Sequence, residues 1–453
     1  MEIDIQYFND RTVRTTEQIK AVAQEAKSTF VLICTGLTVP PIEEMTLRRM
    51  ETIAESTGAV MIYSDHRTTA DNGTTELQRC LDYTPGSVRD DFYFGPLLLI
   101  RTDALRRATT QMDADYTAAG IYDLRLRLSR IGHICHIPEP LYTIPLEDKR
   151  KSGERQFDYV NPRNRESQIE MEMAFTSHLK AIGAYLTPVF KTPDYGENWP
   201  VTASVIIPVR NRKTTICDAV RSALSQQCSF SFNVIVVDNH SSDGTTELLR
   251  DIKDPRLIHV IPPEENMGIG GCWNKALNHE KCGKFAVQLD SDDLYSSTGT
   301  LQAIIDTFEA EQCGAVIGSY SLTDIALQPL PPGIIDHREW SDSNGRNNAL
   351  RINGLGAPRA FATAIARMYP MPDVSYGEDY AMCLRICREY RIGRIYDVLY
   401  LCRRWEGNTD AALTRDAENR NNAYKDFIRA TELRARIAMN ATNRKAVNHG
   451  RKH

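Results

Sequence analysis

The chain has 453 residues, of which 42% are hydrophobic and 25% charged, and its formal net charge is −5. A chain of this size can bury a full core, so the composition excludes a mainly disordered protein and removes the need for a disulfide or metal to hold the fold. The slight acidic excess argues against nucleic acid as a partner, because phosphate binding favours a basic surface.

The eleven cysteines include no pair at CxxC spacing, which favours reduced thiols in a cytoplasmic protein. The first residues, MEIDIQYFND, lack the basic and apolar pattern of a signal peptide. The longest apolar runs have the length of strands, well below the ~20 residues that cross a bilayer. We therefore expect a cytoplasmic protein that could also act at the inner face of the membrane.

In chain order, the first half alternates strand and helix patterns. Apolar runs predict strands at 28–36 and 58–65, and apolar spacing predicts a helix at 42–57. We assign residues 1–150 to one α/β domain and 151–200 to a helical linker, with most of 157–186 in a helix.

The second half starts after a polar joint, KTPDYGENWPVT, which is rich in turn-forming residues. Four β-branched runs without polar alternation predict buried parallel strands, and two amphipathic helices separate the first three of them. The strands are expected at 203–209, 232–238, 256–263 and 284–290, and the helices at 213–227 and 244–252. This pattern predicts an α/β fold with helices on both faces of the sheet.

Acidic residues follow the fourth of these strands in the sequence DSDD, Asp290 to Asp293. In open α/β sheets, ligands bind beyond the carboxyl ends of the strands, so DSDD and the DNHSSDG turn at 238–244 should face one crevice. Clustered carboxylates repel one another unless a cation compensates them. A hard divalent metal with open positions for phosphate oxygens would do so, although Asp-x-Asp patterns also occur in solvated turns.

Six ordered segments together resemble family 2 glycosyltransferases, which have the GT-A fold. They span residues 203–410 and read ASVIIPVRNR, VVDNHSSDGTTELL, ENMGIGGCWNKAL, DSDD, YGEDYAMCLR and RRWEGNTD. The resemblance implies a catalytic GT-A domain at 201–412, a mixed sheet flanked by helices, followed by a C-terminal helix and basic tail at 413–453. It also implies Mn²⁺ or Mg²⁺ and a nucleotide-sugar donor, with UDP favoured.

The resemblance assigns a role to each matched residue on the donor side. Asp292 and Asp290 bind the metal, and Asp290 also approaches the ribose. The remaining donor contacts are Pro208, Arg210, Asp238, Asn239, Arg403 and Arg404. Asn239 stands where many relatives have a second aspartate, yet an amide can still bind a base edge because it both donates and accepts hydrogen bonds. Asp293 is either a helper of this site or a helix N-cap.

On the acceptor side, the resemblance makes Asp379 the general base, which takes the hydroxyl proton during in-line attack, and Glu378 its neighbour that orients the acceptor. The alternative for Asp379 is a carboxylate that only favours the start of a helix. Trp405 and Asn408 occupy the loop in which some relatives place a metal-binding histidine, and Trp405 either stacks on a sugar or packs in the core.

Two copies of one structural unit would explain a faint repeat between residues 118–144 and 375–403. The first half resembles the family incompletely, since Thr35, Gly36 and Leu37 stand where carboxylates are needed and Ile121 where Asp379 stands. We expect a degenerate, non-catalytic GT-A-like domain there, kept for packing, acceptor guidance or partner binding. The YSDH segment at 63–66 favours a strand-end turn over a displaced metal site.

We therefore predict a metal-dependent inverting glycosyltransferase that uses a saccharide or lipid-linked acceptor in surface polysaccharide or glycan biosynthesis. The alternatives are a sugar nucleotidyltransferase, for which the PVRNRKTT segment lacks a phosphate-loop glycine, and a non-catalytic sugar-nucleotide-binding scaffold. The basic tail favours a solvated chain end, with peripheral contact to anionic lipid as the alternative. The sequence leaves the oligomeric state open.

Overall fold

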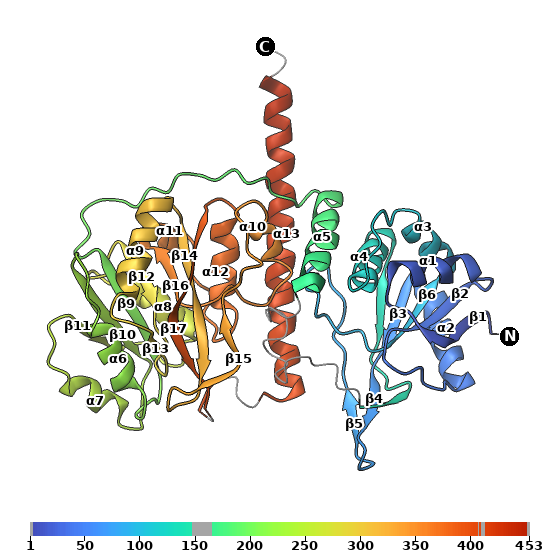
Figure 1. Cartoon of the computed structure of the whole chain (residues 1–453), viewed down its shortest axis with the longest axis horizontal. Coiled ribbons are helices and arrows are strands. Elements are labelled where there is room, and N and C mark those ends of the chain that lie inside the picture. Colours follow the sequence, from blue (N-terminus) through green and yellow to red (C-terminus); the bar gives the residue numbers. More distant parts are fainter. Residues whose placement is uncertain (1–2, 147–164, 406, 409–412, 451–453) are drawn as a thin grey trace.

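The computed structural model describes residues 3–146, 165–405, 407–408 and 413–450. Figure 1 shows two sheet-containing units on either side of the long helix α13 (Arg415–Gly450). The helix α5 (Arg165–Ala181) lies between the two units, against a helix of each. The predicted helical joint and C-terminal helix are thus present where they are described, while 157–164 and 451–453 lie outside the described residues.

The N-terminal unit is built on a five-stranded mixed sheet in the order β1-β2-β6-β3-β7. The predicted strands and helix are confirmed, because β2, β3 and α2 fall within the expected segments. A small sheet, β5-β4-β8, extends from this unit. The elements are β1 (Ile5–Thr12), α1 (Thr16–Glu25), β2 (Phe30–Cys34), α2 (Glu44–Thr57), β3 (Met61–Ser64), β4 (His66–Thr69), β5 (Thr75–Gln78), β6 (Leu97–Arg101), α3 (Thr102–Thr109), α4 (Gly120–Ile131), β7 (Ile134–Ile137) and β8 (Thr143–Pro145).

The C-terminal unit is built on a nine-stranded mixed sheet whose path is β11-β10-β9-β12-β16-β14-β17-β13, with β15 paired to β14. Its first half is β9 (Ala203–Val209), α6 (Ile216–Leu224), β10 (Phe232–Asp238), α7 (Thr245–Asp251), β11 (Leu257–Val260), α8 (Ile269–Leu277), β12 (Phe285–Gln288) and β13 (Leu294–Tyr295). Its second half is α9 (Thr300–Glu311), β14 (Ala315–Thr323), β15 (Pro329–Ile335), α10 (Gly345–Asn348), β16 (Arg359–Ala362), α11 (Thr363–Met368), α12 (Glu378–Cys387) and β17 (Ile392–Arg403).

The four predicted strands of this sheet are confirmed as parallel neighbours β11, β10, β9 and β12. Every residue of β10 and β12 is buried, as expected for strands covered by helices on both faces. The carboxyl ends of β9, β10 and β12 therefore meet at one edge, and Asp238 and Asp290 lie at that edge. The predicted α/β class with a mixed, helix-flanked sheet is confirmed.

Helix α13 joins the two units through buried charges. Arg429 lies fully buried and donates to the carbonyl oxygens of Leu350 and Ile352 in the C-terminal unit. On the other side Asp426 accepts from the Ser87 hydroxyl at 3.1 Å and pairs with Arg89 of the N-terminal unit at 3.3 Å. Because removing one partner of a buried pair leaves an uncompensated charge, these contacts hold the two units in one arrangement.

The backbones also approach closely at this junction. A Cβ atom added to Gly86 would lie 1.8 Å from the backbone oxygen of Asp426, so only glycine allows the N-terminal loop to touch the helix. Arg351 of the C-terminal unit, fully buried, pairs with Asp90. Within the described ranges, no helix is both long enough and apolar enough to span a membrane.

Candidate functional site

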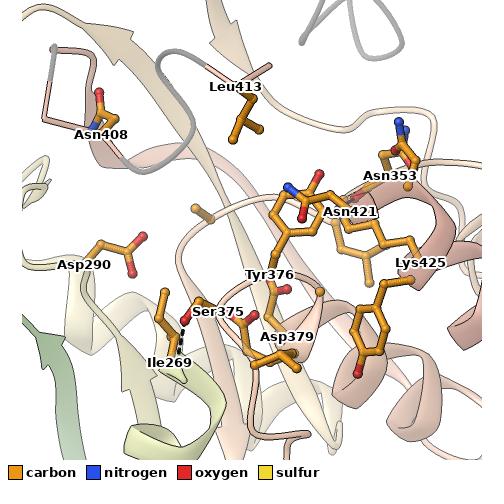
Figure 2. A pocket seen from close by; sticks show the side chains of 18 of the residues that line it. Ile269, Asp290, Asn353, Ser375, Tyr376, Asp379, Asn408, Leu413, Asn421 and Lys425 are labelled. Atoms are coloured by element: carbon orange, nitrogen blue, oxygen red, sulfur yellow. Dashed lines mark hydrogen bonds between the residues drawn. The ribbon is translucent and has the colours of Figure 1, made fainter. Parts of the chain in front are cut away.

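A cleft of about 1640 Å³ opens at the carboxyl ends of β9 and β12. It continues past the start of α12 to the first turns of α13 and to residues 79–93 of the N-terminal unit. Figure 2 shows Asp290 and Asn408 on one side of this pocket, Asn353, Asn421 and Lys425 on the other, and Asp379 between them. One continuous cleft thus joins the DSDD strand end to the Glu378–Asp379 pair.

At the strand end, the side chains of Asp290, Asp292 and Asp293 all line the cleft. Both carboxylate oxygens of Asp290 accept from the Gln288 amide, at 2.9 and 3.1 Å. Asp293 accepts from the backbone N–H of Arg403 at 2.7 Å. The structure therefore places Asp293 as an anchor for the end of β17.

The three carboxylates are neighbours with little exposure to solvent, since Asp292 and Asp293 are buried and Asp290 is partly buried. Burial raises the pKa of Asp290. The positive charge of Arg359 opposes this rise, and repulsion from Asp292 adds to it. Burial, together with repulsion from Asp290 and Asp292, raises the pKa of Asp293 well above its ordinary value. A divalent cation at Asp290 and Asp292 would relieve this repulsion, so the donor set fits a hard metal ion.

The second acidic pair lies at the start of α12. Gly377 precedes the helix with φ = +86°, a left-handed conformation that favours glycine, and this sharp turn directs Glu378 and Asp379 into the cleft. Asp379 pairs with the guanidinium of Arg359 at 3.0 Å. Burial would raise the pKa of Asp379, but Arg359 and Lys425 hold it below its ordinary value.

Glu378 differs sharply from its neighbour. Its side chain is buried, and its Oε2 atom has no hydrogen-bond partner among the residues that the structure describes. Burial, together with repulsion from Asp379, raises the pKa of Glu378 to about 8. At neutral pH the pair therefore consists of an ionised Asp379 and a protonated Glu378, which is the separation of roles that an acid–base site requires.

The glycine-rich segment that begins α8 positions the chain that leads to this pair. A Cβ at Gly270 would lie 2.0 Å from the Pro372 carbonyl oxygen, so the glycine permits close contact with that loop. Asn274 fixes the same loop by donating to the Met371 carbonyl at 2.7 Å and accepting from the Met371 N–H at 2.9 Å. The GIGGCWN segment thus acts through the loop before α12.

At the end of the cleft where the resemblance places the nucleotide, Pro208, Arg210 and Asn239 line the cleft, whereas Asp238 does not. The Asp238 carboxylate lies fully buried and accepts from the Ser241 N–H at 3.0 Å and from the Thr246 hydroxyl at 2.5 Å. Burial opposes its ionisation, yet these bonds and one from His259 keep the pKa of Asp238 below its ordinary value. The structure therefore places Asp238 as a support for the turn and Asn239 on the cleft wall.

The two arginines of the closing loop also differ. Arg404 lines the cleft, whereas Arg403 is 3% exposed and turns toward the Asp292 carbonyl oxygen and Asp218. Beyond them, the Trp405 indole and the Asn408 amide donate to Asp292 Oδ2 at 3.3 and 3.2 Å. Trp405 thus contacts the acidic strand end through its indole N–H. This polar contact is neither the sugar stacking nor the core packing that the sequence suggested.

Sequence reasoning missed two charged groups of this site. Arg359 starts β16 and lies between the two acidic pairs, and its electrostatic partners are Asp379 and Asp290. Lys425 comes from α13, and burial lowers its pKa to about 8. Arg359 lies in the GLGAPRAF segment at 354–361, where no motif marks it, and no local pattern distinguishes Lys425 from a solvated helix lysine.

The YSDH segment ends β3 and begins β4, and Asp65 lies between the two strands. Asp65 accepts from the Cys80 N–H at 2.8 Å and from His136 Nε2 at 2.9 Å. The Asp65, Cys80 and His136 ligand atoms lie within 4.8 Å of one another, but the other ring nitrogen of His136 contacts Asp82 at 2.9 Å. Two carboxylates thus flank the imidazole, which serves as a bridge between them.

Part of the chain is similar to known proteins. Residues 204–369 match the model of glycosyl transferase family 2, so the chain carries a family 2 glycosyltransferase domain over less than half of its length. TuaG of Bacillus subtilis (strain 168), provisionally named a teichuronic acid biosynthesis glycosyltransferase, is 35% identical over 126 residues, which cover 28% of this chain and 49% of TuaG.

A second relative is the Escherichia coli protein WfaP, named UDP-Glc:alpha-D-GlcNAc-diphosphoundecaprenol beta-1,3-glucosyltransferase. It is 39% identical over 95 residues, which cover 21% of this chain and 37% of WfaP. The chain thus spans half or less of the length of these two curated relatives. Among solved structures, S. aureus TarS 1–349 in complex with UDP-GlcNAc superposes with a TM-score of 0.40 and 21% identity, covering 51% of this chain and 71% of TarS 1–349.

Proposed function

We propose that this chain is a metal-dependent inverting glycosyltransferase that moves a sugar from a nucleotide-diphosphate donor, most favourably UDP, to a saccharide or lipid-linked acceptor. The observation that carries the proposal is the single cleft that holds both Asp290–Asp293 and Glu378–Asp379, with Arg359 between them. A donor site and an acceptor-side carboxylate are the two parts that single-displacement transfer requires.

On the donor side, Asp292 and Asp290 would hold Mn²⁺ or Mg²⁺, which would offset the negative charge of the diphosphate leaving group. Arg404 lines the same part of the cleft and presents a planar guanidinium suited to phosphate oxygens. Asn239 and Pro208 would border the nucleoside. Arg403, buried beneath the loop, would support this end without touching the donor.

On the acceptor side, Asp379 is the proposed base. As the acceptor oxygen forms its bond to the anomeric carbon, the bond from that carbon to the diphosphate oxygen breaks, and the hydroxyl proton passes to Asp379. Arg359 keeps Asp379 ionised before the reaction, because it favours the charged form of the carboxylate. Glu378, protonated at neutral pH, can donate a hydrogen bond to the acceptor from beside the base.

We further propose that the N-terminal unit is a non-catalytic relative of the same fold. The order and strand directions of its sheet match those of the inner C-terminal strands β9, β12, β16, β14 and β17. The names of TuaG and WfaP support a setting in polysaccharide or glycan biosynthesis.

The test uses the purified full chain with UDP-glucose, UDP-galactose, UDP-N-acetylglucosamine and GDP-mannose, with and without Mn²⁺. We expect metal-stimulated binding and slow hydrolysis of at least one of them, detected as release of the nucleoside diphosphate. Failure to bind any of them would favour a scaffold, and formation of pyrophosphate from a nucleoside triphosphate and a sugar phosphate would favour a nucleotidyltransferase. Either result would overturn the proposal.

A further inference from the structure

The cleft extends well beyond the residues of the family-matched domain. Its far end is lined by Arg79, Tyr93, Asn353, Asn421 and Lys425, which come from the N-terminal unit, the loop before β16 and helix α13. We propose that this junction is the acceptor subsite and that it takes an uncharged pyranose saccharide. The inference rests on the proposed function and names the elements and the ligand class of its acceptor side.

The position of the junction follows from the proposed base. Asp379 lies between the Asp290 side of the cleft and the Asn421 and Lys425 side (Figure 2). Since the donor occupies the Asp290 side of the cleft, the acceptor hydroxyl that Asp379 deprotonates must enter from the Asn421 and Lys425 side. The Glu378 Oε2 atom, buried and without a hydrogen-bond partner on this cleft wall, provides a polar group whose partner would be a ligand.

The lining chemistry favours a sugar. The amides of Asn421 and Asn422 can both donate and accept hydrogen bonds, as hydroxyl groups require, whereas those of Asn353 and Asn419 already bond within the protein. Tyr93 and Tyr376 supply rings that can cover the apolar face of a pyranose. Together these side chains form a polar wall that carries two aromatic rings, which suits a ligand with many hydroxyl groups and an apolar ring face.

The charges of the junction favour an uncharged ligand. Arg89 pairs with Asp91 at 2.6 Å and with Asp426 at 3.3 Å. Arg415 donates to the Gln78 amide oxygen at 2.7 Å and lies 3.6 Å from Glu418. Since these cations already have protein partners, an anionic ligand would have to compete for them.

Both flanking elements are fixed against the catalytic unit. Asn353 donates to Asp91 of the N-terminal unit at 2.8 Å, and the Lys425 ammonium donates to the Asn353 carbonyl at 2.6 Å. Lys425 also lies 4.3 Å from the ring centroid of Tyr376. The subsite is therefore preorganised, and the N-terminal unit is part of it.

The test measures binding of p-nitrophenyl glucoside, galactoside, N-acetylglucosaminide, mannoside and glucuronide to the full chain with UDP and Mn²⁺, by saturation-transfer NMR. We expect at least one uncharged glycoside to bind, and Tyr93→Ala and Asn421→Leu each to raise its Kd at least about tenfold. Matched controls are Tyr396→Ala, at a tyrosine 41% exposed against 39% for Tyr93, and Asn443→Leu on the exposed end of α13. Both controls should bind as the unchanged chain does.

Unchanged UDP binding shows that a variant is folded. If Tyr93→Ala or Asn421→Leu does not fold, Tyr93→Leu or Asn421→Ala is used in its place. Binding of no uncharged glycoside, binding of the glucuronide alone, or normal binding by either cleft variant would overturn the inference. Hydrolysis of the nucleotide sugar by the unchanged chain is measured separately. If the unchanged chain hydrolyses the nucleotide sugar while the glycoside experiment fails, the subsite inference is wrong and the proposed function still stands.

Discussion

The two units of this chain share one sheet arrangement but differ at the edge where the C-terminal unit carries its acidic residues. In both, a parallel pair, two antiparallel pairings and a second parallel pair follow one another in the same order, β1-β2-β6-β3-β7 and β9-β12-β16-β14-β17. The C-terminal sheet adds β10 and β11 beside β9, on the side where the nucleotide is expected.

The strand registers align the two sheets residue by residue. Phe30 of β2 pairs with Ile5 and Arg101, as Phe285 of β12 pairs with Ala203 and Ala362. Counting from these residues gives the corresponding positions Thr35 and Asp290, Leu37 and Asp292, Leu98 and Arg359. The first turns of α4 and α12 give a fourth pair, Ile121 and Asp379.

The comparison separates the scaffold from the chemistry. Sheet order depends on buried apolar strands, which both units keep. At the corresponding positions the N-terminal unit has Thr35, Leu37, Leu98 and Ile121, none of which carries a charge. The N-terminal unit packs against α13 and lines one wall of the cleft.

The largest contrast is expected at the metal position. Asp292→Ala should abolish metal-dependent binding of the nucleotide sugar, and with it turnover, because a carboxylate ligand is lost. The corresponding Leu37→Ala should leave both unchanged. Calorimetric titration of UDP with and without Mn²⁺ measures the effect, and metal-stimulated binding that survives in Asp292→Ala would contradict the assignment.

A second contrast concerns the base. Asp379→Asn should keep donor binding and lower turnover by roughly 10²–10⁴-fold, since an amide cannot accept the proton. Ile121→Val, at the corresponding position of α4, should turn over normally. Steady-state kinetics together with donor Kd values decide the matter, and near-normal turnover in Asp379→Asn would remove Asp379 from this role.

A third contrast concerns Arg359, whose corresponding residue in the N-terminal sheet is Leu98. The Arg359→Leu variant has at this position the residue type of the N-terminal sheet. Loss of the guanidinium should raise the pKa of Asp379, so the rising limb of the kcat/KM profile should move to higher pH by about one unit. Arg359→Lys, which keeps a positive charge, should move it less. An unmoved limb in Arg359→Leu would show that this pairing does not control the base.

The smallest effect is on stability. The pKa of Glu378 is raised from the ordinary value of 4.5 to about 8 in the folded chain. Between pH 4.5 and pH 8, the folded chain therefore keeps a proton on Glu378 that the unfolded chain has lost. Stability should therefore fall as pH rises through this window, and Glu378→Gln should remove a decrease on the order of 1–3 kcal/mol. Denaturant unfolding at pH 5 and pH 8 measures it.

The exposed Glu247→Gln is the control for that experiment, because its carboxylate is solvated at the start of α7. It should keep the full pH dependence of the unchanged chain. Equal pH dependence in Glu378→Gln and the unchanged chain would mean that Glu378 ionises normally in the fold.

Much of the fold and part of the site could be predicted from sequence. Unbroken apolar runs indicated β9, β10 and β12, because a strand buried on both faces has no polar alternation. The carboxyl ends of these strands, and hence Asp290 and Asp292, followed from sheet topology. Asp379 was expected at the base position or at a helix start, and it lies in the first turn of α12.

Other residues were decided by tertiary contacts. Asp238 and Arg403 carry charges that local patterns place at the site, yet both are buried beneath it. Lys425 belongs to a helix whose sequence resembles a solvated one, but α13 packs between the units and brings that ammonium into the cleft. The periodicity of a helix sequence indicates which face of the helix is apolar. It does not indicate which charged residues from distant parts of the chain will contact that helix.

The sequence by itself therefore determined the strands, the acidic strand end and the acidic helix start, because backbone preference and apolar burial act over a few neighbouring residues. Only the tertiary structure decided that the N-terminal unit and α13 complete one cleft with them. That outcome depends on buried pairs such as Arg89 with Asp426, whose partners lie hundreds of residues apart, and attraction between such groups exists only after the chain has folded.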